Sequence, residues 1–438
     1  TTATAAYNTA VGSNAGGAIT TGDSNTLIGG LAGDALTTSS QNTAVGYLAL
    51  SAQADGASQN VAVGFKAGTD NTGGDGLTAI GRQAAESNTT GDDNTVVGSL
   101  ALQNNTIGSG AVAIGRLALQ DQNPATSTHT YNVAVGYHAG KEVTTGLNNV
   151  FVGGQCGDAL TTAEGNVAVG YASFSEATKS QLNVAVGNLA LQNVNHTTTT
   201  NAYNIGVGAS AGRNITTGIR NVLLGGLAGD ALTDADQNVA VGYGALTTDT
   251  LGSNSVAVGN NALESQNHTT ATDAFNTAVG GNAGNAITDA VRNTLVGGVA
   301  GDALTSADFN TAVGYGALTS DTLGERSTAI GYFSLVSQNR TTASQSNNTA
   351  VGFQSGANIT TGDENVFIGA DAGDGMTTAS NCVIVGFSSS ASTFNGNGQI
   401  VIGHDINGGG NNTVRLGTTG GGTATLSLDG SDTSWAAA

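Results

Sequence analysis

The chain has 438 residues, of which 68 are Gly and one is Pro, and only 10% of the residues are charged. So many glycines and so few charges argue against ordinary globular domains, and Gly lacks the three-residue period of collagen. The formal net charge is −20. It argues against nucleic acid and anionic membrane surfaces as partners, since both require basic patches. No apolar run is long enough to cross a bilayer, so we expect no membrane insertion.

A short motif, Asn-x-Ala-Val-Gly, recurs along the chain, and its Gly marks 23 copies between Gly12 and Gly403. Most copies are 17 residues apart, while one spacing is 18 and four are 21. The long spacings follow a schedule, because Gly64, Gly136 and three later copies are each 72 residues apart. The duplicated unit is therefore a block of four coils.

A unit of 17 residues is too short for a pair of helices and fits one turn of a β-solenoid. We therefore predict an all-β fold, a parallel β-roll or β-solenoid of about 23 coils, with one short strand at each Ala-Val-Gly motif. Residues 1–405 form the predicted repeat shaft, and residues 406–438 form a predicted C-terminal β tip with strands near 414–416 and 424–428. The Asn before each strand, for example Asn132 or Asn166, is expected to stack as a ladder.

Each predicted strand is apolar on both faces, since Val133 and Val135 point one way and Ala134 points the other. A strand that is apolar on both faces is buried on both. One face lines the interior of the coil, so we expect other copies of the chain to cover the second face. The pattern predicts a side-by-side homo-oligomer; the alternative is a monomer with a wide apolar stripe.

The four long coils each carry four additional residues in a Thr-rich or Ser-rich loop. An aromatic residue stands just before the strand Asn in three of these coils, and Asn347 takes its place in the fourth. Either the ring packs over the coil edge and the loop adjusts the rim, or the loops contact a receptor or neighbouring fibres. The candidate contacts are Tyr131, His196, Tyr203, His268, Phe275 and Arg340.

Catalytic signatures are missing from the sequence, and its seven Glu residues occupy varied positions in the coils. We expect no enzyme activity, no catalytic residues, no cofactor and no metal site. The acidic segment Asp70–Asp75, followed by Asp92 and Asp93, is interpreted as a solvated turn, with a Ca²⁺ site as the alternative. The two cysteines, Cys156 and Cys382, are predicted to be buried thiols.

The repeats Asn42–Ala49, Ser255–Ala262 and Asn310–Ala317 resemble the head repeats of trimeric autotransporter adhesins, and related repeats occur in phage tail-fibre proteins. The resemblance covers about residues 8–405. It implies a left-handed β-roll that assembles as a homotrimeric fibre. The ending Trp435–Ala438 resembles the stretch that precedes self-cleaving intramolecular chaperone domains, which makes Ala438 a candidate processing end.

These features lead us to expect a structural and adhesive fibre, a phage tail fibre of the virion that attaches to a host-surface glycan or protein receptor. A bacterial cell-surface adhesin or extracellular filament of the same fold is the alternative. A polysaccharide-degrading tailspike is a third interpretation, which would require a groove with paired carboxylates.

Overall fold

A computed structural model describes residues 6–53, 56–419 and 424–427. The candidate processing end at Ala438 and the neighbouring Trp435 lie outside these residues. The chain divides into two compact units, Thr1–Arg220 and Asn221–Ala438, and each unit is described by itself below.

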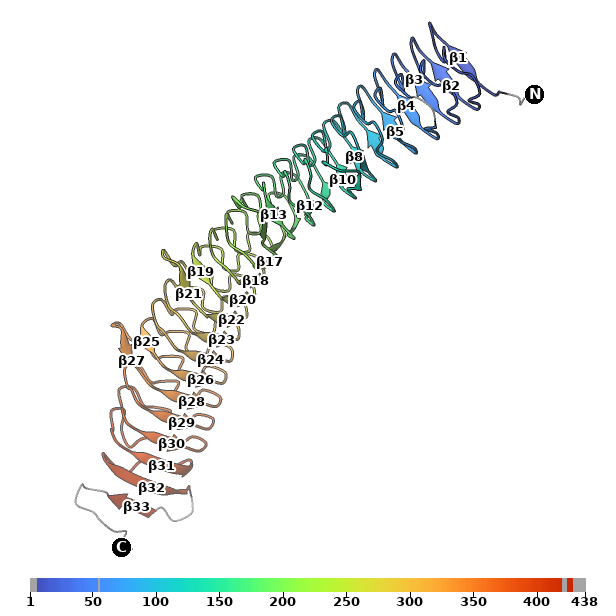
Figure 1. Ribbon diagram of the computed structural model, residues 1–438. Helices are drawn as coiled ribbons and strands as arrows, with labels where there is room; N and C mark the ends of the chain where they lie inside the picture. Colours follow the sequence, from blue (N-terminus) through green and yellow to red (C-terminus); the bar gives the residue numbers. More distant parts are fainter. Residues whose placement is uncertain (1–5, 54–55, 420–423, 428–438) are drawn as a thin grey trace. The chain divides into compact units, whose positions relative to one another are not determined.

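Both units confirm the predicted all-β solenoid. The described residues contain no helix and form about 24 parallel coils, spaced about 17 residues apart. Figure 1 shows, within each unit, one short strand per coil lying beside the strand of the next coil. We call these the sheet strands.

In the first unit the sheet strands are β1 (Thr9–Val11), β2 (Thr26–Ile28), β3 (Thr43–Val45), β4 (Val61–Val63), β5 (Thr78–Ile80), β6 (Thr95–Val97), β8 (Val112–Ile114), β10 (Val133–Val135), β11 (Val150–Val152), β12 (Val167–Val169), β14 (Val184–Val186) and β16 (Ile205–Val207). In the second unit they are β17 (Val222–Leu224), β18 (Val239–Val241), β20 (Val256–Val258), β22 (Thr277–Val279), β23 (Thr294–Val296), β24 (Thr311–Val313), β26 (Thr328–Ile330), β28 (Thr349–Val351), β29 (Val366–Ile368), β30 (Val383–Val385), β31 (Ile400–His404) and β32 (Thr413–Thr418).

The end of the second unit departs from the 17-residue spacing. Strand β32 pairs parallel with β31, with Ile400 opposite Val414, so the stack continues one coil beyond the last Gly of the motif. Strand β33 (Ala424–Ser427) then pairs antiparallel with β32. Both strands expected in the C-terminal segment are therefore present.

Stacking is strictly in register, because equivalent residues of successive coils pair with each other. Val133 of β10 lies opposite Val150 of β11, and Val150 lies opposite Val167 of β12. The predicted asparagine ladder is confirmed. Asn149 Oδ1 accepts a hydrogen bond from the backbone N–H of Asn166 (3.0 Å), and its Nδ2 donates to the carbonyl of Ala163 (3.0 Å). The ladder thus satisfies buried backbone groups that the short strands leave free.

The motif Gly, which follows the sheet strand in most coils, is required by two features of the backbone. At Gly136 the φ angle is +143°, a region that side chains rarely adopt. A Cβ atom there would lie 2.3 Å from the carbonyl oxygen of Gly153 in the next coil. Any larger residue would therefore push the two coils apart.

The core of each coil is narrow and is filled by the middle residue of the sheet strand together with residues of the following turn. Ala134, Phe151 and Cys156 are fully buried. Phe151 fills the space that Gly140 and Gly157 leave open, because a Cβ at either Gly would lie 2.7 Å or less from its ring. Cys156 and Cys382 are buried free thiols, as predicted.

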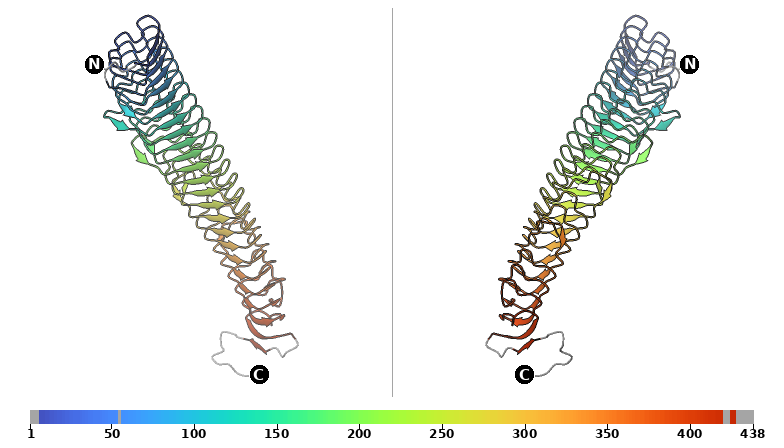
Figure 2. Two further views of the ribbon diagram at one scale, coloured as in Figure 1. Left: turned by 90° about the vertical axis from the view of Figure 1, so that its right-hand side faces the viewer. Right: turned by 90° about the vertical axis from the view of Figure 1, so that its left-hand side faces the viewer.

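The four additional residues of each long coil contribute a second, two-residue parallel ladder. In the first unit β7 (Gly108–Ser109) pairs with β9 (Thr128–His129), and β13 (Ser180–Gln181) pairs with β15 (Thr200–Asn201). In the second unit β19 (Gly252–Ser253) pairs with β21 (Thr272–Asp273), and β25 (Gly324–Glu325) pairs with β27 (Ser344–Gln345). Figure 2 shows these lateral strand pairs at the side of each unit, away from its sheet strands.

Candidate functional site: an apolar sheet face, two aromatic columns and lateral loops

The sheet strands present an apolar outer face. Their middle residues are buried, whereas the first and third residues are half-buried or exposed, as Val133 and Val135 illustrate around the buried Ala134. We define the outer face as these first and third residues. Thr, Val, Ile and Leu supply nearly all of them, and several large members are close to 40% exposed, including Ile28 and Ile80 in the first unit and Ile368 and Ile402 in the second. Of the two strand faces that were predicted to be buried, the one that lines the interior of the coil is therefore buried within one chain.

A column of residues with left-handed backbone precedes the strand Asn, and it contains three of the candidate contacts. Tyr131, Tyr203 and Phe275 have φ angles near +50° and are 60%, 49% and 49% exposed. Tyr7 holds the same position and is 77% exposed. In the second unit the ring of Phe309 lies between two guanidinium groups of this column, 5.6 Å from Arg292 and 5.8 Å from Arg326. Cation–π attraction thus binds neighbouring coils along the column.

A second aromatic column, which is not among the predicted contacts, follows the strand Gly. Tyr47 and Phe65 stack in the first unit with ring centroids 5.7 Å apart. In the second unit Tyr332 stacks on both Tyr315 (5.8 Å) and Phe353 (5.4 Å). The recurrence of Tyr or Phe directly after the motif Gly was the available signal. Exposed rings therefore stand both before and after the sheet strands in the sequence of a coil.

The two candidate histidines lie beneath the lateral loops, because their side chains are only 6% and 4% exposed at His196 and His268. His196 Nδ1 lies 2.5 Å from the Ser180 hydroxyl, and its Nε2 lies 3.0 Å from the Thr217 carbonyl oxygen. The imidazole links three successive coils in this way. Histidines placed so deeply stabilise the loop and offer little surface to a receptor.

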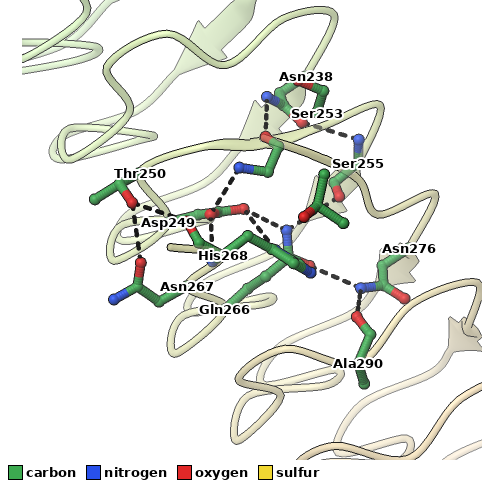
Figure 3. Close-up of polar contacts among 12 residues, drawn as sticks. Asn238, Asp249, Thr250, Ser253, Ser255, Gln266, Asn267, His268, Asn276 and Ala290 are labelled. Atoms are coloured by element: carbon green, nitrogen blue, oxygen red, sulfur yellow. Dashed lines mark hydrogen bonds and ion pairs between the residues drawn. The ribbon is translucent and has the colours of Figure 1, made fainter. Parts of the chain in front are cut away.

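His268 belongs to a buried polar network centred on Asp249 (Figure 3). The Asp249 carboxylate accepts hydrogen bonds from the backbone N–H of Gly252 (3.0 Å), the backbone N–H of His268 (3.0 Å) and Nε2 of Gln266 (2.5 Å). His268 Nδ1 lies 3.6 Å from Asp249 Oδ2. Burial alone would raise the pKa of Asp249, but the hydrogen bonds from His268 and Gln266 lower it below its ordinary value.

This network continues into the asparagine ladder, since Asn276 Nδ2 donates to Gln266 Oε1 (2.9 Å) and to the carbonyl of Ala290 (2.7 Å). One block later the arrangement recurs at Asp321, which accepts from Gly324 N (3.0 Å), Arg340 N (3.0 Å) and Gln338 Nε2 (2.5 Å). The sixth candidate, Arg340, also places its guanidinium 3.1 Å from the Asp363 carboxylate. Its side chain is 15% exposed, so it too serves mainly to hold the loop.

The exposed part of each lateral loop is a tip of three small residues above the buried network. The tips are residues 125–127 and 197–199 in the first unit and residues 269–271 and 341–343 in the second. All of them are Thr, Ser or Ala. Of the contacts predicted for the loops, only the three aromatic residues present substantial surface.

The acidic segment near Asp75 is built into the stack. The Asp75 carboxylate accepts from the backbone N–H of Ser58 (2.6 Å), and that of Asp92 accepts from the backbone N–H of Asp75 (2.9 Å). Within the described ranges, no group of three or more His, Cys, Asp or Glu side chains is placed to hold a metal ion. The same residues include no helix long and apolar enough to span a membrane.

The chain was compared with protein-family models, with curated proteins and with solved structures, and none of them matches it.

Proposed function

We propose that the protein is a non-enzymatic structural fibre in which three copies pack side by side through their outer faces. The observation that supports this proposal is the outer face itself. In coil after coil of each unit it presents branched apolar side chains that the described parts of one chain leave half-exposed. Contiguous apolar surface of this kind marks an interface between proteins. In-register stacking also makes each unit a regular support, because each coil contacts only its neighbours.

In this proposal the fibre attaches a particle or cell to a host surface, and a phage tail fibre is the context that we favour. The repeat pattern, the exposed aromatic columns and the lateral tips all fit a protein whose sides carry contact surfaces. A bacterial cell-surface adhesin of the same fold is the second candidate, since it would use the same outer face and the same loops. Genome neighbours, either virion genes or an outer-membrane anchor, distinguish the two.

Sedimentation equilibrium of the full chain tests the assembly. We expect a particle with three times the chain mass of 42.7 kDa. The double substitution Val169→Lys and Val186→Lys places charges on the outer face of β12 and β14, and we expect it to reduce the particle to monomers. Thr198→Lys adds a charge at an exposed loop tip and is the matched control, which should leave the trimer intact. A wild-type monomer would falsify the proposal.

A further inference from the structure

The first unit contains a cavity of about 470 Å³ on the side of four successive coils, within the size range of small-ligand sites. Its wall combines three carboxylates, two amides, a hydroxyl and an aromatic ring, and it is formed by Glu142, Gln155, Asp158, Ala159, Tyr171, Ala172, Ser175, Glu176, Leu189 and Gln192. The ring of Tyr171 is 56% exposed. The cavity therefore offers both hydrogen-bonding groups and a flat apolar surface.

Two polar groups in this wall lack the hydrogen bond that their counterparts make in the second unit. There, the hydroxyl of Thr247 donates to the carboxylate of Asp230 one coil before it, and Thr319 donates to Asp302 in the same way. Asp158 and Ser175 occupy the equivalent positions in the first unit. Ser175 is only 9% exposed, and the structure gives no hydrogen bond between its hydroxyl and the Asp158 carboxylate. Asp158 and Ser175 are therefore not bonded to each other as their counterparts are, and both residues line the cavity.

One carboxylate of the wall departs from the repeat. Glu176 stands where equivalent coils have Asn104, Thr248 and Ser320, none of which is charged, whereas Gln155 recurs as Gln83 in the preceding block. Glu176 therefore adds a negative charge that the other blocks lack at this position.

We propose that this cavity binds a saccharide unit that carries no acid group. Carboxylates accept hydrogen bonds from sugar hydroxyls, and such charge-assisted bonds are strong. The amides of Gln155 and Gln192 both donate and accept. The ring of Tyr171 offers a surface on which the C–H face of a pyranose can pack. Sugars bearing carboxylates or sulfates are excluded by Glu142, Asp158 and Glu176, because Lys141 is the cation that offsets them and it already pairs with Glu142 at 3.3 Å.

The electrostatics of the cavity agree with this assignment. Burial, together with the nearby charges of Glu176 and Glu142, raises the pKa of Asp158 to about 6. A hydroxyl donor would compensate for the lost hydration of this carboxylate without adding charge. The inference rests on the proposed attachment function, for which it names the ligand class and one binding site.

A glycan array probed with the full-length protein tests the inference. Neutral and amine-bearing glycans are expected to give signals, whereas glycans with uronic or sialic acids are not. For the strongest neutral glycan on the array, Asp158→Asn and Glu176→Gln should each weaken binding about tenfold in titration calorimetry, as the loss of a charged hydrogen bond implies. Asp230→Asn is the matched control, because its carboxylate is already bonded to Thr247, and it should leave binding unchanged.

Three results would overturn the inference: no signal from any neutral or amine-bearing glycan, strongest binding of acidic glycans, or unchanged binding in both Asp158→Asn and Glu176→Gln. Thermal melting of each variant confirms that it is folded, and Glu176 is exposed, so its substitution leaves the stack intact. Sedimentation of the same samples reports the trimer separately. A trimer that binds no saccharide would contradict the saccharide site but not the trimeric fibre. A monomer that binds saccharide would contradict the trimeric fibre but not the saccharide site.

Discussion

The backbone N–H of His268 donates a hydrogen bond to Oδ1 of Asp249 in the preceding coil, at a distance of 3.0 Å, and neither side chain reaches the surface. The four additional residues of the long coil thus stand over a buried carboxylate that organises the turn. With two further donors on the same carboxylate, the charged form is solvated by protein groups instead of water.

Substitution of Asp249 by Asn should destabilise the second unit by about 3 kcal/mol at pH 7, because an amide would turn a donor toward N–H groups. Since the folded pKa of Asp249 is lowered, its contribution to stability is present above the unfolded pKa near 3.9 and is lost as the pH falls through the folded pKa. Urea unfolding at pH 7 and pH 3 should show a deficit that shrinks in acid. Glu164→Gln, at an exposed position, should show none, and an equal deficit at both pH values would refute the assignment.

The asparagine ladder predicts a sharp difference between two asparagines of the first unit. Asn149→Ala leaves the backbone N–H of Asn166 and the carbonyl of Ala163 without their partners, which should cost about 3 kcal/mol. Asn188→Ala removes an exposed side chain and should cost less than about 0.5 kcal/mol. Urea unfolding measures both, and similar losses would show that the ladder contributes little.

Two glycines provide an equally sharp comparison. Gly136→Ala should destabilise by about 3 kcal/mol or more, because the left-handed backbone is strained by a side chain and the new Cβ would lie 2.3 Å from the carbonyl oxygen of Gly153. Gly281→Ala meets nothing within 4 Å and should be neutral. Thermal melting decides between them, and a neutral Gly136→Ala would mean that the coils can separate without cost.

Substitution of Asp158 by Asn is expected to stabilise the first unit. Burial and the charges of Glu176 and Glu142 raise the pKa of Asp158 to about 6, so its ionised form opposes folding above pH 6, and this penalty fades as the pH falls from 6 toward 4. Asp158→Asn should therefore stabilise the first unit at pH 7 by about 1 kcal/mol, allowing for solvent screening of a half-exposed group. Melting curves at pH 7 and pH 4 should show the gain largely at pH 7. A loss of stability at pH 7 would contradict the raised pKa.

The repeat alone predicted the solenoid and the Asn ladder, because both follow from residues that recur at one position of successive coils. The burial of the two thiols was predicted from the general tendency of free Cys to lie in the interior. It could not predict that His196 and His268 are buried. A loop that is longer than its neighbours suggests protrusion, and only the three-dimensional structure shows that the added residues form a strand beside the preceding coil. The cavity at Asp158 could not be predicted from the sequence for a different reason. Its residues are spread over four coils, and only the stacked structure shows that they line one cavity.

Within each unit, the two lateral tips are separated by one block of four coils, which at the spacing of parallel strands corresponds to about 19 Å. In the attachment fibre that we propose, the lateral tips would meet a host surface at this fixed interval. A single tip of Thr, Ser and Ala residues offers little surface, but contacts repeated at a fixed interval raise the effective concentration of each next contact once the first has formed. Avidity of this kind would favour surfaces whose receptors repeat at a matching distance over a soluble copy of the same receptor.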